Sequence, residues 1–302
     1  MSSLGVVMIV KNEEKVLEKC LKSVEGVDEI VICDTGSTDS TLEIAKKFTD
    51  KVYTDYKWED SFAKARNHAK SKSTTDWILS IDADEELQEG GVELIRKAIK
   101  YLEKNNHEAL GIRMNAENTS DIFHYPRLFK NLKKIEWKGA AHNWLGGIKS
   151  GHPNAEDITI VYGFSPAHKK DPDRTLRILK KEVDRNKELK RERYYLAREY
   201  FYRKDWITAL YHYEEYLKRG VWHPELADAW VMKAKCLWYL HRGEEARNAV
   251  MQAIKINPEF KEAFLVMSDM VYEQYKPSWL KHAKNCTNNG VLFVRNYDRK
   301  KR

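Results

Sequence analysis

Hydrophobic residues in the first 90 positions gather in short runs that polar residues interrupt. Three of these runs have the length and apolar character of buried strands: Leu4–Val10, Ile30–Cys33 and Trp77–Ile81. Between them, apolar positions recur at helical spacing over residues 16–24. A second helix is expected over Thr41–Phe48, before a short strand near Val52. This alternation predicts an α/β fold whose parallel sheet has right-handed crossovers.

The predicted strands end in polar residues, and the most acidic of these ends is Asp82-Ala83-Asp84-Glu85-Glu86. Open α/β sheets bind their ligands at the carboxyl ends of the strands. Two aspartates separated by one small residue can bind a divalent cation and, through it, the phosphates of a nucleotide. The chain contains neither G-x-G-x-x-G nor a P-loop, which argues against a Rossmann dehydrogenase and a P-loop ATPase.

Asp34 ends the second predicted strand and begins a polar segment that continues to Asp39. Its carboxylate can accept hydrogen bonds from a base or a ribose. It can equally fix a turn or cap a helix, because aspartate favours both roles and Gly36 suits a tight turn. The residue pattern alone leaves both interpretations open.

Strand-like alternation stops after Asp173. Ala197 and Ala209 are separated by the same interval as Ala234 and Ala246, and Pro258 follows where a tetratricopeptide repeat has its closing proline. The pattern is similar to tetratricopeptide repeats, in which small residues let paired helices approach closely. We therefore expect an all-α helical repeat domain over 173–290 and a basic tail over 291–302. The repeats are expected to bind an acceptor, to form a homodimer or only to support the first domain.

Composition limits the class of protein. The chain has 302 residues, of which 33% are charged and 42% hydrophobic, as in soluble globular proteins. No segment approaches the roughly 18–20 apolar residues that span a bilayer, and the N-terminus lacks the pattern of a secretory signal. We expect a cytoplasmic protein whose 4 cysteines are reduced thiols. The net charge of +7 favours anionic partners such as a sugar nucleotide, nucleic acid or a phosphorylated surface.

Several short motifs together point to one family. They are Val10-Lys11-Asn12-Glu13-Glu14, Asp34-Thr35-Gly36-Ser37-Thr38-Asp39, Ala65-Arg66-Asn67, Asp82-Ala83-Asp84-Glu85-Glu86-Leu87, Tyr125-Pro126-Arg127-Leu128-Phe129 and Trp137-Lys138-Gly139-Ala140-Ala141-His142. In this order and spacing they resemble family-2 glycosyltransferases over about the first 170 residues. The resemblance implies an α/β GT-A (Rossmann-like) nucleotide-diphospho-sugar transferase domain over 1–172, ahead of the helical domain.

The resemblance also implies roles for individual residues. The loop containing Val10, Asn12 and Glu13 holds the nucleoside together with Asp34. Arg66 lies near the base and phosphates, and Arg127 is expected to contact phosphate or acceptor. Asp82 approaches the ribose or the metal, Asp84 coordinates Mn²⁺ or Mg²⁺ on the diphosphate, and His168 returns to the metal or the diphosphate. The residues assigned to the metal are thus Asp82, Asp84 and His168.

The general base stays open among Glu85, Glu117, Asp121 and His142. Inverting transfer needs a base that takes the acceptor's proton. Glu85 directly follows Asp84, so it is a base or a carboxylate that orients a ligand. His142 matches a histidine that glutamate often follows in the family, but Asn143 stands here. Arg113 and Lys138 are expected to contact phosphate or acceptor, or to be solvated.

These observations predict a metal-dependent inverting glycosyltransferase. It would move a sugar from a nucleoside-diphosphate sugar, UDP-sugar being expected, to a saccharide, a protein or a modified nucleobase in DNA. The alternative is a non-catalytic repeat scaffold with a decayed transferase domain.

Overall fold

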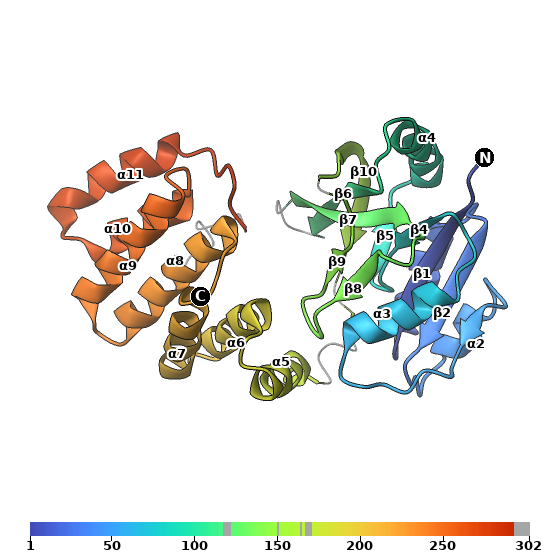
Figure 1. The fold of residues 1–302 in the computed structure, drawn as a ribbon, viewed down its shortest axis with the longest axis horizontal. Helices are drawn as coiled ribbons and strands as arrows, with labels where there is room; N and C mark the ends of the chain where they lie inside the picture. The colour runs from blue at the N-terminus through green and yellow to red at the C-terminus, as the bar shows by residue number, and fades with distance from the viewer. Residues whose placement is uncertain (117–121, 150, 164, 167–170, 293–302) are drawn as a thin grey trace. The chain divides into compact units, whose positions relative to one another are not determined.

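The computed structural model describes residues 1–116, 122–149, 151–163, 165–166 and 171–292 (Figure 1). Glu117, Asp121 and His168, which the sequence nominates for catalysis or metal binding, lie outside these residues. The chain divides into two compact units, Met1–Pro172 and Asp173–Arg302. Among the described residues, none of the helices combines the length and the apolar character needed to cross a membrane.

The first unit contains one large mixed sheet with the strand order β3-β2-β1-β4-β7-β6-β10-β5. Its strands are β1 (Leu4–Val10), β2 (Glu29–Asp34), β3 (Val52–Tyr53), β4 (Trp77–Ser80), β5 (Glu85–Leu87), β6 (Ala109–Ala116), β7 (Ile122–Lys130) and β10 (Asn154–Tyr162). The first four strands of that order pair in parallel, which confirms the predicted α/β sheet. β7 is antiparallel to both neighbours, so the second half is mixed.

Alternate side chains of the central strands enter two separate cores. Val6 and Met8 pack with one face's helices, which are α1 (Leu17–Ser23), α2 (Thr41–Ala45) and α4 (Gly91–Lys104). Val7 faces the opposite core, which α3 (Phe62–Ser71) shares with the hairpin of β8 (Glu136–Lys138) and β9 (Trp144–Gly146). Figure 1 shows α3 lying across β1 and β2. Period-2 burial in the parallel strands thus explains why helices cover both faces.

The helix expected over Thr41–Phe48 is shorter in the structure, because α2 ends at Ala45. The amides of Lys47 and Phe48 donate to the carbonyls three residues earlier, those of Ile44 and Ala45. The final turn is therefore tightened beyond α-helical geometry, as helix ends commonly are. The sequence does not predict β5, because two of its three residues are acidic.

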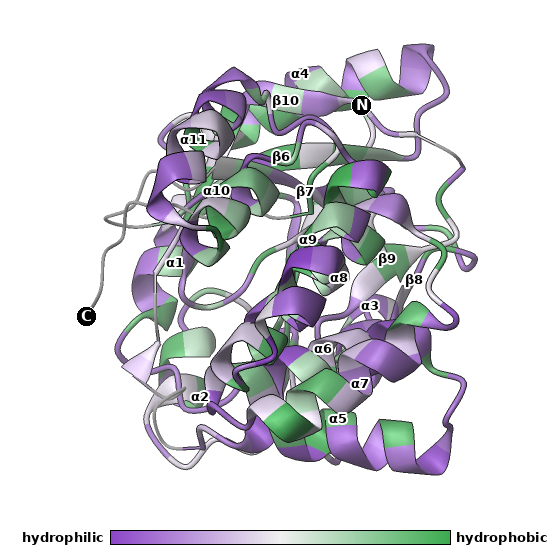
Figure 2. Cartoon of the chain, turned by 90° about the vertical axis from the view of Figure 1, so that its left-hand side faces the viewer, coloured by the Kyte–Doolittle hydropathy of each residue, from purple (hydrophilic) through white to green (hydrophobic). Residues whose placement is uncertain are grey.

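The second unit is entirely helical over its described residues. Its helices are α5 (Arg174–Arg185), α6 (Lys190–Tyr202), α7 (Trp206–Leu217), α8 (His223–Tyr239), α9 (Gly243–Ile256), α10 (Lys261–Met270), η2 (Glu273–Tyr275) and α11 (Lys276–Asn285). Consecutive helices pack on one another, and the four repeat alanines are buried at these contacts. In Figure 2 green and purple segments alternate along α5, which matches its buried Ile178, Leu179 and Val183 between charged residues. The expected helical domain is confirmed.

Candidate active site

The carboxyl ends of β1, β2 and β4 meet at one edge of the sheet. β1 pairs in parallel with β2 on one side and with β4 on the other, and Val10 lies opposite Asp34 in the register. Asp82 follows the end of β4 after one further residue. The three loops that the sequence nominates for donor binding therefore share one edge, which is where open α/β sheets bind ligands.

The loops after β1 and β2 are locked together by hydrogen bonds. The Asp34 carboxylate is 4% exposed and accepts from the backbone amides of Gly36 at 2.9 Å and Ser37 at 3.0 Å. Asn12 has a positive φ of 58°. Its backbone amide donates to Ser37 Oγ at 2.9 Å, and its side-chain Oδ1 accepts from the Thr38 backbone amide at 2.7 Å. Asp34 thus fixes a turn, while a carboxylate retains acceptor sites beyond two hydrogen bonds.

Asp82 lies between two arginines from different elements. Arg66 on α3 donates to Asp82 Oδ1 at 2.6 Å, and Arg127 on β7 donates to Asp82 Oδ2 at 3.3 Å. Arg127 also forms a short ion pair with Glu85, whose second oxygen accepts from the Asp82 backbone amide at 2.8 Å. The structure therefore brings these four predicted site residues into one network.

Burial and charge act in opposite directions on this network. Burial by itself raises the pKa of Asp82, but Arg66 and Arg127 hold that pKa well below its usual range. Burial raises the pKa of Glu85 above its usual range, an effect that Arg127 opposes and the Asp82 and Asp84 carboxylates strengthen. Burial by itself lowers the pKa of Arg127, but the Glu85 and Asp82 carboxylates raise it by more than burial lowers it. Asp82 is therefore an ionised carboxylate whose negative charge is offset by the two arginines.

Aromatic rings support both arginines. The Arg66 guanidinium lies 5.3 Å from the centre of the Trp137 ring, and that of Arg127 lies 5.5 Å from Tyr125. The rings of Tyr125 and Trp137 stack at 6.4 Å with an interplanar angle of 14°. Planar guanidinium groups stack favourably on such rings. This support fixes the direction in which the two arginines reach Asp82.

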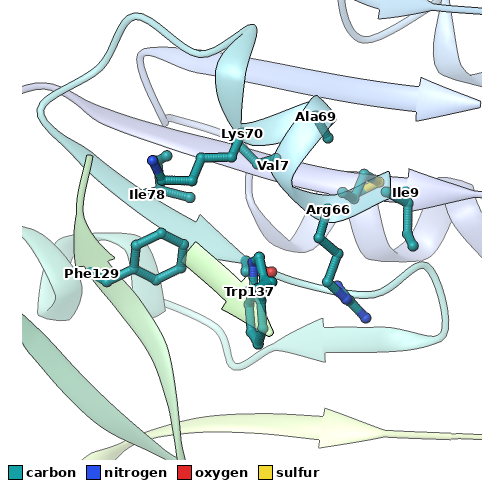
Figure 3. A pocket seen from close by; sticks show the side chains of 10 residues that line it. Val7, Ile9, Arg66, Ala69, Lys70, Ile78, Phe129 and Trp137 are labelled. Carbon is teal, nitrogen blue, oxygen red and sulfur yellow. The ribbon is translucent and has the colours of Figure 1, made fainter. Parts of the chain in front are cut away.

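A small pocket on the same face of the sheet contains Arg66 and Trp137 side by side (Figure 3). Most of its lining is apolar and belongs to the core beneath α3, with Val7, Ile78 and Phe129 among the contributors. Asp82 and Asp84 do not line it. The pocket is therefore a packing gap behind the charged network rather than the donor site.

The remaining predicted residues lie outside the network of Asp82, Arg66 and Arg127, apart from Glu85. His142 is exposed, has a φ of +47° and lies in the loop that joins β8 and β9. The Tyr125 hydroxyl donates to the Asn143 carbonyl at 2.6 Å, which ties this loop to the strand that carries Arg127. Lys138 is exposed on β8, and Arg113 is half-buried on β6. Glu85 is 5% exposed with both oxygens engaged, which favours an orienting role over that of a base.

Sequence reasoning missed one residue of this edge, Ser165. Its backbone amide donates to Asp84 Oδ2 at 3.2 Å, and its hydroxyl donates to Glu13 Oε2 at 2.5 Å. The contacts span 81 and 152 positions of the chain. No local pattern around Ser165 signals such contacts, because they depend on where β10 ends.

Comparison with known proteins decides the family. Residues 5–154 match the family described as Glycosyl transferase family 2. The N-terminal half of the chain is a family-2 glycosyltransferase domain. The chain is 36% identical over 148 residues to a TPR repeat-containing protein of Synechococcus elongatus, covering 47% of this chain and 35% of that protein. It is 33% identical over 138 residues to the SPbeta prophage-derived glycosyltransferase SunS of Bacillus subtilis, covering 45% of this chain and 33% of SunS. The matches thus span about a third of these curated relatives.

Among solved structures, the crystal structure of S. aureus TarS 1–349 in complex with UDP gives a TM-score of 0.45 at 15% identity. That alignment covers 95% of this chain and 88% of the other. A Mycobacterium tuberculosis glucosyl-3-phosphoglycerate synthase in complex with Mn²⁺ and UDP-glucose gives 0.33 at 20% identity, covering 38% and 44%.

Asp82 is a poor ligand for a hard cation, because both of its carboxylate oxygens accept from arginines. Among residues 1–116, 122–149, 151–163, 165–166 and 171–292, no group of three or more His, Cys, Asp or Glu side chains is placed to hold a metal. Mg²⁺ commonly uses one or two carboxylates and completes its shell with substrate phosphates and water. Both Asp82 oxygens face arginines, whereas Asp84 accepts from a neutral amide, that of Ser165.

Proposed function

We propose that this chain transfers a sugar from a nucleoside-diphosphate sugar, of the UDP-sugar class, to a nucleophilic acceptor with inversion at the anomeric carbon. The observation that carries the proposal is the edge at which Asp34, the Arg66–Asp82–Arg127 network and Asp84 meet, within a family-2 glycosyltransferase domain. The uridine preference rests on the family resemblance.

The nucleoside would lie against the linked loops after β1 and β2. Their geometry is preset by the bonds between Asn12, Ser37 and Asp34, so that binding would not have to order them. Preorganised loops bind with a smaller entropic penalty. Arg66 and Arg127 would lie beside the diphosphate, held in place by Asp82 and by their aromatic supports.

Asp84 would hold Mn²⁺ or Mg²⁺ together with the donor diphosphate. When bound, such a cation offsets the negative charge that develops on the leaving diphosphate. Asp82 would orient Arg66 and Arg127 rather than bind the cation, because its oxygens accept from both arginines. Glu85 would hold Arg127 from its other side. His142, exposed in the loop between β8 and β9, is the proposed proton acceptor among the described residues.

The acceptor is proposed as a saccharide, a protein or a modified nucleobase in DNA. The helical unit gives a protein or polymer a surface to bind, and the net charge of +7 favours an anionic acceptor. A nucleic-acid acceptor would show a steep loss of affinity with added salt, because phosphate contacts release counterions. A neutral saccharide would show little salt dependence.

Calorimetric titration with UDP, UDP-glucose, GDP and other nucleoside diphosphates tests the proposal, with and without Mn²⁺. We expect one nucleotide to bind in a metal-dependent manner and Asp84→Ala to abolish the metal dependence. The matched control is Asp157→Ala, an exposed aspartate on β10 that should leave binding unchanged. A folded protein that binds no nucleotide would refute the enzyme and favour a repeat scaffold.

A further inference from the structure

The residues that follow β10 form hydrogen bonds with Asp84. β10 runs antiparallel to β5, and Tyr162 lies opposite Glu85 at the last pair of the register. The pairing extends past this point, since the Gly163 amide donates to the Asp84 carbonyl at 2.9 Å. The Ser165 amide then donates to the Asp84 side chain at 3.2 Å. The backbone that leaves the sheet is therefore held against both the main chain and the carboxylate of Asp84.

The Ser165 side chain makes a second connection, to the loop after β1. Ser165 is 1% exposed, and its hydroxyl donates to Glu13 Oε2 at 2.5 Å. The backbone of Glu13 is itself fixed, because its amide donates to Thr41 Oγ1 at 2.7 Å and its carbonyl accepts from the Leu17 amide at 2.9 Å. Ser165 thus joins an anchored carboxylate at the end of β1 to Asp84 beyond the end of β4.

The chemistry of this connection differs from that around Asp82. Arginines hold the Asp82 carboxylate and neutralise it. A serine orients two carboxylates through a hydroxyl and an amide without adding positive charge. A hydrogen bond from a neutral donor to a carboxylate is strong enough to fix its direction. The Ser165 contact therefore fixes the direction of a carboxylate without itself offsetting the negative charge that a cation binds.

We propose that Ser165 is a positioning residue for the donor site, fixing Asp84 through its amide and Glu13 through its hydroxyl. The inference rests on the proposed function, in which Asp84 binds the cation of the donor diphosphate. It adds that the chain immediately after β10 sets the geometry of this carboxylate. The loop after β1 and the loop after β4 would then respond together when the hydroxyl is removed.

Calorimetry of UDP binding, with and without Mn²⁺, tests this role. Ser165→Ala keeps the backbone amide that contacts Asp84 but removes the hydroxyl that holds this backbone to Glu13. We expect the Mn²⁺-dependent affinity for UDP to fall about tenfold, which is the effect of losing one hydrogen bond to a charged group. Metal-free affinity should fall less than the Mn²⁺-dependent affinity, because Ser165 reaches the cation site through Asp84. Ser165→Thr keeps a hydroxyl and should restore the affinity. Ser268→Ala is the matched control, since Ser268 is 2% exposed, lies in the helical unit and donates to the Leu265 carbonyl at 2.7 Å.

The outcomes separate the two ideas. If the wild-type protein binds UDP with Mn²⁺ and Ser165→Ala binds it equally well, the positioning role is overturned and the proposed function stands. If the wild-type protein shows no metal-dependent binding, both are overturned. Should Ser165→Ala fail to fold, Ser165→Cys has nearly the same size with only a weak donor. It should then show the same selective loss of metal-dependent affinity, and an unchanged affinity would again overturn the inference.

Discussion

Replacing Arg127 by methionine tests the charged network most directly, because methionine keeps much of the length and none of the charge. Arg127 is 8% exposed and pairs with Glu85, which is 5% exposed, and with Asp82. Removing one partner of a buried ion pair leaves an uncompensated charge and costs about 3–5 kcal/mol. For a unit of this size such a loss lowers the melting temperature by roughly 10 °C.

Two further variants show whether the loss comes from the stranded charge. Glu85→Gln removes the buried carboxylate charge, so the double variant Arg127→Met/Glu85→Gln should be more stable than Arg127→Met alone. Arg96→Met is the matched surface control, because the Arg96 and Asp28 side chains are 28% and 45% exposed and form a 3.1 Å ion pair. Exposed pairs contribute about 0–1 kcal/mol, so this variant should be nearly neutral.

The assay is urea unfolding in metal-free buffer. Unfolding is monitored through hydrogen exchange of the peptide that contains β4, which mass spectrometry measures. This readout reports the first unit selectively, whereas tryptophan fluorescence would combine both units. A loss below about 1 kcal/mol for Arg127→Met, or strict additivity with Glu85→Gln, would refute the coupled network. In a coupled network the double variant departs from additivity by at least about 0.5 kcal/mol.

Two other substitutions should separate folding from binding. Asp82→Asn should lower stability in urea unfolding by about 2–4 kcal/mol, because it removes the carboxylate charge opposite Arg66 and one of the two carboxylate partners of Arg127. Asp84→Asn should change stability by less than about 1 kcal/mol and mainly weaken Mn²⁺-dependent nucleotide binding. In the helical unit, burial lowers the pKa of His212 from 6.5 to about 4, so the unfolded chain takes up a proton first and stability falls as pH drops from about 6.5 to about 4. His212→Gln should remove roughly 2–3 kcal/mol of that fall in pH-dependent denaturation, and an unchanged profile would contradict the assignment.

Much of the fold follows from local patterns. The parallel strands are short apolar runs, and Val6 and Val7 alternate between two cores as period-2 burial requires. The helical unit follows from the spacing of its alanines, all of which are buried. β5 does not follow, because Glu85 and Glu86 give it no apolar signature. It exists because β10 supplies a partner from a distant part of the chain.

The roles of the acidic residues after β4 show why the site is only partly predictable. The residue pattern by itself does not distinguish Asp82 from Asp84, and only the family resemblance gives them different roles. The structure distinguishes them, since Arg66 and Arg127, 16 and 45 positions away, reach Asp82. Ser165, 81 positions away, reaches Asp84. The motif predicts that acidic groups lie at the sheet edge, but their distant partners decide how each carboxylate is held.

The backbone after β4 explains how neighbouring carboxylates acquire different surroundings. The Glu85 amide donates to the Asp82 carbonyl at 3.0 Å, and the Glu85 carboxylate accepts from the Asp82 amide at 2.8 Å. This turn directs the Asp82 and Glu85 side chains to the same partner, Arg127, while Asp84 between them meets Ser165. A relative that has the same acidic motif but lacks an arginine at the position of Arg127 would leave Glu85 buried without its charge partner. We therefore expect glutamate at position 85 and arginine at position 127 to depend on each other, whatever sugar or acceptor the enzyme uses.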